Sequence, residues 1–334
     1  MILKTFGKES SPNLQRLNLS RNENLGDEPN GETSLGSVSH VDELDLSQCG
    51  LSGDWLANLL SFPKQSTTDK DNGVAKDDLP TWKKLHLQDN LLGTTGFNAL
   101  LPLIRNSSLH ALNISKCDLE DESITRVADS SAVSDGKPSL LSLDMSNNNI
   151  SATGMSAVSE ALQPLGVLSK LVDLNLSGNP IGGDGVTMLA KALEARLKLE
   201  GSTVLKTLDL SNTQCGIQAA IDIVSFGNLE SLHLFNNTLG SDGFIALAAA
   251  TLQGGHSSIQ YLDLGGNGAD QESVVTLLGA LLQSAGDDKK NQLKVLVVGG
   301  NETGEDVEQM VTKVREVHPS LDIARDKKGK RQPT

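Results

Sequence analysis

Few residues of this chain have the types and spacing that catalysis or metal binding requires. The three cysteines, Cys49, Cys117 and Cys215, include no C-x-x-C pair, so they do not form a zinc motif. Glycine clusters at residues 182–185, 265–268 and 299–300 lack the G-K-[ST] ending of a phosphate-binding loop. We therefore predict that the protein is not an enzyme and that it binds no cofactor and no metal.

One group of side chains does have the chemistry of a protein-binding surface. It combines Phe235 and Tyr261, the only tyrosine, with His233, Asp209 and Asp263. Aromatic rings beside carboxylates often anchor protein interfaces. We predict that these five residues bind a partner, provided that the fold brings them to one face.

A repeated motif supplies the elements that would position them. In this motif, positions 4 and 6 lie two residues apart on an extended segment and point to one side, so position 5 points to the other. Apolar residues at spacings of three and four follow most copies and predict a helix after each strand. The motif is L-x-x-L-x-L-x-x-N or a close variant, and it begins at Leu14, Val41, Trp82, Leu109, Leu140, Leu171, Leu205, Leu229, Ile259 and Leu293.

Parallel strands at each motif would place position 5 of every repeat in one exposed column. His86 and His233 share this column, but at about 4.8 Å per strand they lie about 24 Å apart and cannot share a metal ion. Phe235 stands at position 7, where most repeats have serine. Basic residues lie toward the front of this face, at Arg16, Arg21 and Lys84, and acidic residues lie behind them.

The motif resembles that of the leucine-rich repeat family, and the long helical halves look like its ribonuclease-inhibitor-like branch. The resemblance covers about nine tenths of the chain and implies an α/β solenoid, or horseshoe, of about ten repeats. Parallel strands would line its concave face and helices its convex face. Position 9, occupied by Asn, Cys or Thr, is expected to be buried and to bind backbone groups of adjacent repeats. Cys49 and Cys117 occupy this position, and Cys215 occupies position 11, so all three are expected to be structural.

The sequence suggests one domain with three irregular segments. We expect a leucine-rich repeat domain over residues 1–324, with a polar loop inserted at about 62–80, and a basic flexible tail at 325–334. The stretch from 23 to 40 has no helical period and is expected to be irregular. Little sequence precedes Leu14 to cover the first repeat, so we expect either a piece of a longer protein or a partner that docks on this end.

Charge and composition narrow the partners and the compartment. A formal net charge of −14 disfavours nucleic acid and anionic membranes, so we expect a basic or neutral protein partner, no nucleic acid, no membrane insertion and a monomer. An odd number of cysteines and no apolar leader favour the cytoplasm. The basic run at residues 327–331 leaves a nuclear address as an alternative.

The leading functional hypothesis is an intracellular scaffold or adaptor that binds a protein on its concave face. Two alternatives come from the family resemblance alone. The first is a GTPase-activating or other regulatory protein like the Ran GTPase activator, although that protein has an acidic tail and this tail is basic. The second is the sensing or autoinhibitory part of a larger signalling or actin-regulatory protein, as in immune-receptor and tropomodulin-like members.

Overall fold

The computed structural model describes ten stretches of the chain: residues 11–27, 38–60, 79–106, 108–128, 138–163, 166–200, 205–226, 228–254, 258–283 and 292–325. Contacts divide the chain into two compact units, residues 1–174 and 175–334, which we describe one at a time. The loop expected at about 62–80 lies outside the described residues except for 79–80. The expected tail lies outside them except for Arg325.

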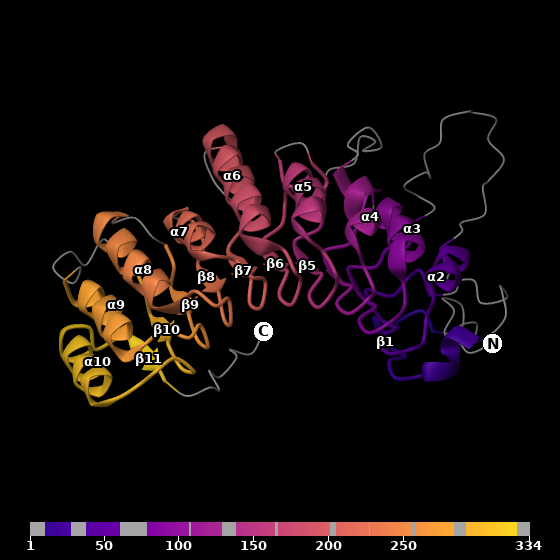
Figure 1. The fold of residues 1–334 in the computed structure, drawn as a ribbon. Helices are drawn as coiled ribbons and strands as arrows, with labels where there is room; N and C mark the ends of the chain where they lie inside the picture. Colours follow the sequence, from indigo (N-terminus) through magenta and orange to yellow (C-terminus); the bar gives the residue numbers. More distant parts are fainter. Residues whose placement is uncertain are drawn as a thin grey trace. The chain divides into compact units, whose positions relative to one another are not determined.

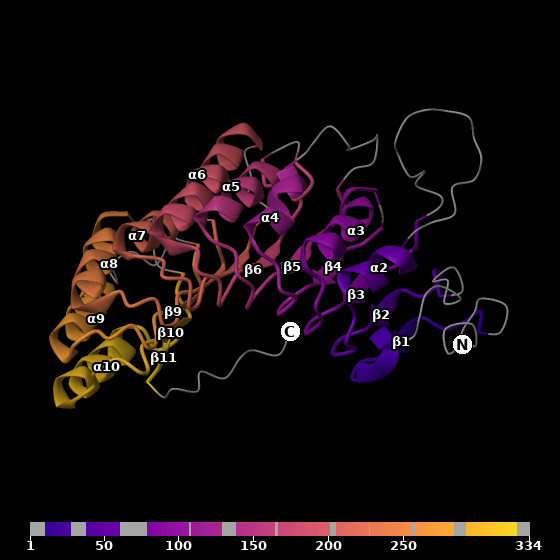
Figure 2. The same cartoon turned by 45° about the vertical axis from the view of Figure 1, so that its right-hand side comes forward.

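The first unit alternates three-residue strands with helices (Figures 1 and 2). Its strands are parallel and pair in chain order, with Leu17, Leu44, Leu85, Leu112 and Leu143 in register from strand to strand. The elements are β1 (Arg16–Asn18), η1 (Glu23–Asp27), β2 (Glu43–Asp45), α2 (Gly53–Leu59), β3 (Lys84–His86), α3 (Gly93–Asn106), β4 (Ala111–Asn113), α4 (Asp121–Ile124), η4 (Thr125–Ala128), β5 (Ser142–Asp144) and α5 (Ala152–Ala161).

The second unit repeats this plan. Leu208, Leu232, Leu262, Leu296 and Ile323 are in register on its successive parallel strands. Strand β6 (Asp173–Asn175) lies at the boundary of the two units. The elements that follow are α6 (Gly182–Glu200), β7 (Thr207–Asp209), α7 (Ile217–Ser225), β8 (Ser231–His233), α8 (Gly240–Gly254), β9 (Tyr261–Asp263), α9 (Gln271–Gln283), β10 (Val295–Val297), α10 (Glu305–Val317) and β11 (Asp322–Ala324).

The predicted fold class is confirmed. Within the described stretches, strands and helices alternate, and ten of the eleven strands fall on motif positions 3 to 5. One expectation is corrected, because residues 23–27 of the supposedly irregular stretch form the 3-10 helix η1. This short helix buries Leu25, and the Gly26 N–H donates to the Cys49 carbonyl at 3.1 Å, so the turn is held against the next repeat.

The core lies between the strands and the helices, and the leucines of the motif fill it. Positions 1, 4 and 6 are buried in nearly every repeat, and each fully buried leucine contributes about 2 kcal/mol relative to an exposed one. Trp82 takes position 1 of the third repeat, where it is 1% exposed. Its indole N–H donates to the Val38 carbonyl at 3.0 Å, which attaches the turn before the second repeat to the third repeat.

Position 9 connects neighbouring repeats, as the motif predicts. Asn90 accepts hydrogen bonds from the N–H groups of Cys49 and Leu51 and donates to the carbonyls of Leu46 and Leu87, at 2.7–3.1 Å. Where cysteine replaces asparagine, the Cys49 thiol donates to the Leu19 carbonyl at 3.1 Å. These groups satisfy backbone atoms that the turn would otherwise bury unpaired.

Position 8 has the same unusual backbone in every repeat. Its residue lies in the left-handed region, with φ between 51° and 82°, because the chain must turn sharply after each strand. The ten residues at position 8 are Arg21, Gln48, Asp89, Lys116, Asn147, Gly178, Asn212, Asn236, Gly266 and Gly300.

No helix in the described stretches is both long and apolar enough to cross a membrane.

Candidate protein-binding site

The exposed side of the strands, which we call the strand face, consists of motif positions 3, 5 and 7. In most repeats it satisfies its own hydrogen bonds. An aspartate or asparagine at position 5 accepts the N–H of position 7, as Asp209 does from Ser211 at 2.9 Å. The serine hydroxyl at position 7 often donates to the same oxygen, as Ser177 does to Asn175 at 2.8 Å. The polar consensus of this face therefore supports the turns.

The repeat that contains β8 departs from this arrangement at two positions. His233 replaces the acidic or amide residue at position 5, and Phe235 replaces the serine at position 7. The Phe235 side chain is large and 36% exposed. This repeat therefore has two rings on the strand face where its neighbours have small polar groups.

His233 stacks on Tyr261 of the next strand. Their ring centroids are 4.7 Å apart, with an interplanar angle of 32°. The Nε2 atom of His233 also lies 3.2 Å from the Ser231 hydroxyl, within hydrogen-bond distance. Two of the five predicted site residues are thus in direct contact.

Carboxylates flank His233 on both sides. Strand register places Asp209 beside His233 on β7, and Asp263 beside His233 on β9. Burial raises the pKa of Asp263, and the neighbouring Asp209 adds to the rise, whereas the Gly265 N–H and the charge of His233 lower it. Burial also raises the pKa of Tyr261, with smaller contributions from Asp263 and Asp209. The site therefore concentrates negative charge around two aromatic rings.

Phe235 lies against glycines of the next repeat. A Cβ atom on Gly265 would be 3.1 Å from its Cδ2 atom, and one on Gly266 would be 3.0 Å from its Cε2 atom. Only residues without a side chain leave room for the ring there. The structure thus brings His233, Tyr261, Asp209 and Asp263 together and places Phe235 on the same face, over Gly265 and Gly266.

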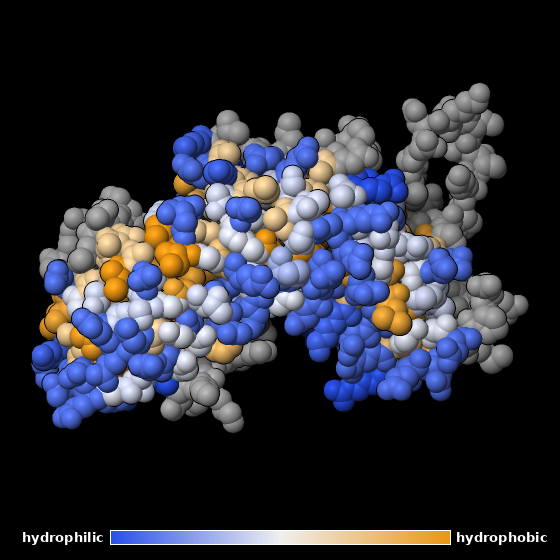
Figure 3. All heavy atoms as spheres, in the orientation of Figure 1, coloured by the Kyte–Doolittle hydropathy of each residue, from blue (hydrophilic) through white to orange (hydrophobic). Residues whose placement is uncertain are grey.

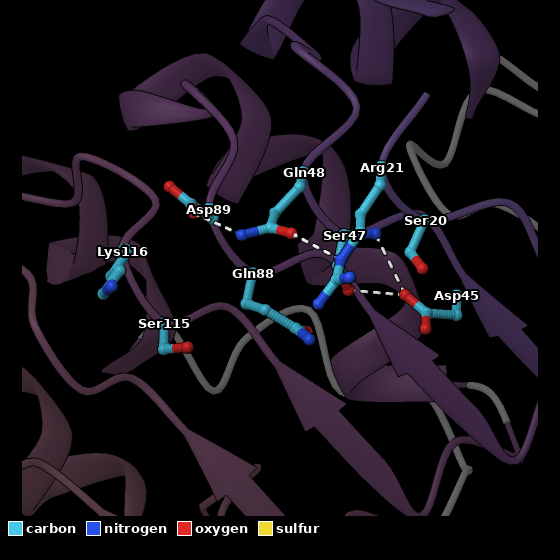
Figure 4. A pocket seen from close by; sticks show the side chains of 9 residues that line it. All are labelled: Ser20, Arg21, Asp45, Ser47, Gln48, Gln88, Asp89, Ser115 and Lys116. Carbon is cyan, nitrogen blue, oxygen red and sulfur yellow. Dashed lines mark hydrogen bonds between the residues drawn. The ribbon is translucent and has the colours of Figure 1, made fainter. Parts of the chain in front are cut away.

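The first unit contains a polar pocket that the sequence analysis did not identify as a site. It encloses about 490 Å³ and opens on the side of the sheet where the strands end (Figure 4). Charged groups of both signs and uncharged polar groups line it. The lining residues are Ser20, Arg21, Asp45, Ser47, Gln48, Gln88, Asp89, Ser115 and Lys116.

Hydrogen bonds join side chains from three successive repeats along this pocket. Arg21 Nε donates to Gln48 Oε1 at 3.2 Å, and Gln48 Nε2 donates to Asp89 Oδ2 at 2.9 Å. All three residues occupy position 8 (Figure 4). The sequence could have indicated this pocket, because position 8 is Arg, Gln, Asp and Lys in the first four repeats and only Asn or Gly in the last six.

All three cysteines lie in the described stretches of the chain. Cys49, Cys117 and Cys215 are buried and free, and burial raises the pKa of Cys117 and Cys215 to about 12. Their position supports the structural interpretation. No group of three or more His, Cys, Asp and Glu side chains in the described part of the chain could hold a metal ion.

Comparison with solved structures identifies a similar fold. An internalin from Listeria monocytogenes matches with a TM-score of 0.51 and 15% identity, over 96% of this chain and 83% of that chain. A chain of the TLR13–ssRNA13 complex matches with a TM-score of 0.42 and 18% identity, over 96% of this chain but only 40% of that one. At these identities, the internalin match establishes the fold alone.

A model of the leucine-rich repeat family matches five segments, residues 10–28, 105–128, 136–159, 167–190 and 228–248. Each segment contains one copy of the motif, in repeats 1, 4, 5, 6 and 8. The other repeats have a strand at the same motif positions and the same left-handed residue at position 8. The chain therefore carries leucine-rich repeats and has the leucine-rich repeat fold.

Proposed function

We propose that this protein is a non-enzymatic scaffold or adaptor that binds a protein partner on the strand face of its second unit. The observation that carries the proposal is the aromatic and acidic group around β8 and β9. His233 contacts Tyr261 and lies between the carboxylates of Asp209 and Asp263, and the partly exposed Phe235 lies on the same face. In most other repeats, Asp or Asn at position 5 accepts a hydrogen bond from the N–H of position 7 and so supports the turn.

The chemistry of this group favours a basic partner. Asp209 and Asp263 supply negative charge, and the rings supply apolar area that a partner can cover. A partner arginine fits both properties, because its guanidinium pairs with carboxylates and stacks on aromatic rings. The net charge of −14 over the whole chain acts in the same direction.

Two further features of the proposal concern the family branch and the compartment. Helices of 14, 19 and 15 residues at α3, α6 and α8 support a ribonuclease-inhibitor-like type of repeat. Buried free thiols at the motif positions of Cys49, Cys117 and Cys215 support a reducing compartment such as the cytoplasm.

The test replaces the two unusual residues by those of the neighbouring repeats. In the double variant His233→Asp/Phe235→Ser, the new carboxylate can accept the N–H of position 7 and the new hydroxyl can donate to it, so the turn is preserved. As a control, Ile245→Ser removes a side chain on α8 that is 49% exposed. The helices carry other apolar groups, which Figure 3 shows around α7 and α8.

The measurement is crosslinking mass spectrometry of partners captured from cells by the wild-type protein and both variants. We expect the double variant to lose the partners that crosslink near β7 to β9, and Ile245→Ser to retain them. Retention of every such partner by the double variant would refute the proposed site. A binding-independent check by circular dichroism confirms that both variants are folded.

A further inference from the structure

The first four repeats have residues at position 8 that their left-handed backbone does not favour, whereas the later repeats have Gly or Asn there. Left-handed backbone is disfavoured for most residues, whereas Gly and Asn tolerate it best. The second unit uses only these two types at the described positions, Gly178, Asn212, Asn236, Gly266 and Gly300. The first four repeats instead hold Arg21, Gln48, Asp89 and Lys116 at φ values of 51° to 62°.

The turn requires left-handed backbone in every repeat, so the unusual feature is the choice of side chains that tolerate it poorly, and such exceptions often lie at binding sites. The four side chains are exposed, and all of them line the polar pocket of the first unit. Aspartate tolerates this backbone almost as well as asparagine, so the unfavourable choices are Arg21, Gln48 and Lys116. These three residues and Asp89 form one row of side chains along the pocket.

The charges along this row are ordered. Arg21 and Asp89 are joined through Gln48, as Figure 4 shows, while the terminal nitrogens of Arg21 and the ammonium of Lys116 make no hydrogen bond or ion pair within the described stretches. Asp45, also in the pocket, is occupied by Ser47 and Asn18. The row therefore presents positive, neutral, negative and positive groups in repeat order.

The pocket floor contains a second unusual residue. Gln88 stands at position 7, where the flanking repeats have Ser47 and Ser115. Its Oε1 atom is buried and has no hydrogen bond in the described structure. Both serine hydroxyls donate to their own strands, to Asp45 and Asn113, and so cannot donate to it. Rotation of the Gln88 side chain would offer this amide to an external N–H group.

The spacing of the row fits an extended peptide. Three strand intervals of about 4.8 Å separate Arg21 from Lys116 by about 14 Å, and four residues of extended chain span about 13 Å. Two acidic side chains at positions i and i+4 of such a peptide would reach the two cations. A basic side chain at i+2 lies on the same edge of the peptide and would approach Asp89.

We propose that this pocket binds an extended segment of a partner protein with the pattern acidic-x-basic-x-acidic. Arg21 and Lys116 bind the two carboxylates, Asp89 binds the central cation, and Gln88 binds the peptide backbone. The site uses no residue of the proposed site around β8 and β9. Either site can therefore fail its test while the other is retained.

The experiment measures fluorescence anisotropy of labelled peptides titrated with the full chain. The probe is Ser-Glu-Ser-Lys-Ser-Glu-Ser, blocked at its amino end and labelled with a rhodamine dye at its carboxyl end. One control peptide reverses every charge, and a second moves the two glutamates next to each other without changing the composition. We expect saturable binding of the probe that weakens with added salt.

The variants separate binding from folding. Lys116→Asn removes one cation and introduces a residue that tolerates left-handed backbone, so we expect the dissociation constant to rise about threefold to fivefold while the melting temperature rises by about 2 °C. Arg21→Asn/Lys116→Asn should weaken binding more than tenfold. Lys313→Gln, on the exposed side of α10, removes the same charge elsewhere and should leave binding unchanged.

Three results would overturn the proposal. The first is no saturable binding of the probe up to about 2 mM, a concentration at which even weak specific peptides bind. The second is equal binding of the probe and either control peptide. The third is an unchanged dissociation constant in the double variant Arg21→Asn/Lys116→Asn with its fold intact.

Discussion

The hydrogen bonds of Asn90 provide the sharpest test of how the repeats are held together. This side chain is 3% exposed, and its four shortest hydrogen bonds join two N–H groups of the second repeat and one carbonyl in each of the second and third. Asn90→Ala would leave three of these backbone groups buried without partners, whereas the Leu87 carbonyl would keep the Cys117 thiol as a donor at 3.2 Å. Each unsatisfied group costs about 1–3 kcal/mol, and local relaxation recovers part of the loss. We expect Asn90→Ala to lower the free energy of unfolding by about 3–5 kcal/mol.

Asn90→Cys is the informative comparison, because the chain itself uses cysteine at position 9. The Cys49 thiol donates to backbone carbonyls, so a thiol at residue 90 should keep that donor and lose only the acceptor. We therefore expect a smaller loss for Asn90→Cys, about 1–3 kcal/mol. Asn24→Ala, at an exposed residue of η1, serves as the control for removing an amide and should change stability by less than about 0.5 kcal/mol.

Urea unfolding followed by tryptophan fluorescence measures these differences. Both tryptophans, Trp55 and Trp82, lie in the first unit, so the signal reports on the unit that contains Asn90. A loss below about 1 kcal/mol for Asn90→Ala would refute the reasoning, since three unsatisfied groups should together cost more than that. A loss for Asn90→Cys as large as that for Asn90→Ala would show that the carbonyl contacts contribute nothing.

Three further predictions concern the thiols, the acidic pair and two glycines. All three cysteines should resist a disulfide-exchange reagent at pH 8 until the protein is denatured. Burial raises the pKa of Cys117 and Cys215 to about 12, so the contribution of these thiols to stability is complete below their unfolded pKa near 8.5. This contribution should decline as the pH rises toward 12, as measured by urea unfolding. Rapid labelling of the native protein would contradict this. Asp209→Asn should lower the pKa of Asp263, whereas His233→Gln should raise it, as measured by NMR titration of the side-chain carboxyl carbon; shifts of opposite sign would contradict the proposed charges. Gly154→Ala should destabilise the protein in thermal unfolding, because the new Cβ atom would lie 2.5 Å from Asp121 Oδ1. Gly279→Ala in α9 should stabilise the protein by about 0.5–1 kcal/mol, because no atom lies within 4 Å of its new Cβ atom. Equal effects of the two substitutions would contradict the packing argument.

The repeat pattern predicted most of the fold because each copy obeys the same local rule. A leucine at positions 4 and 6 must face the core on an extended segment, so the motif located ten strands, and the apolar spacing after most copies of the motif predicted the helices. It also explained why Cys49 and Cys117 are interchangeable with asparagine. The helix η1 was missed because a single apolar residue, Leu25, gives no detectable period.

The candidate sites were less predictable, since they depend on side chains from neighbouring repeats. Sequence position alone placed Phe235 and Tyr261 on one face, but only the structure shows Tyr261 stacked on His233 and Phe235 lying against Gly265 and Gly266. Those contacts join residues about 30 positions apart, and their geometry depends on side-chain rotation that no motif encodes.

The sequence by itself determined the repeat, the alternation of strand and helix, and which residues are buried, because these follow from periodic burial along one chain. The tertiary structure alone decided that position 8 is left-handed in every repeat and that Arg21, Gln48 and Asp89 form a hydrogen-bonded row beside Lys116. Strands only about 4.8 Å apart bring together side chains from successive repeats. The physical reason is that stacked repeats place the side chains of one motif position next to one another. The interactions in such a column therefore depend on residues from several repeats.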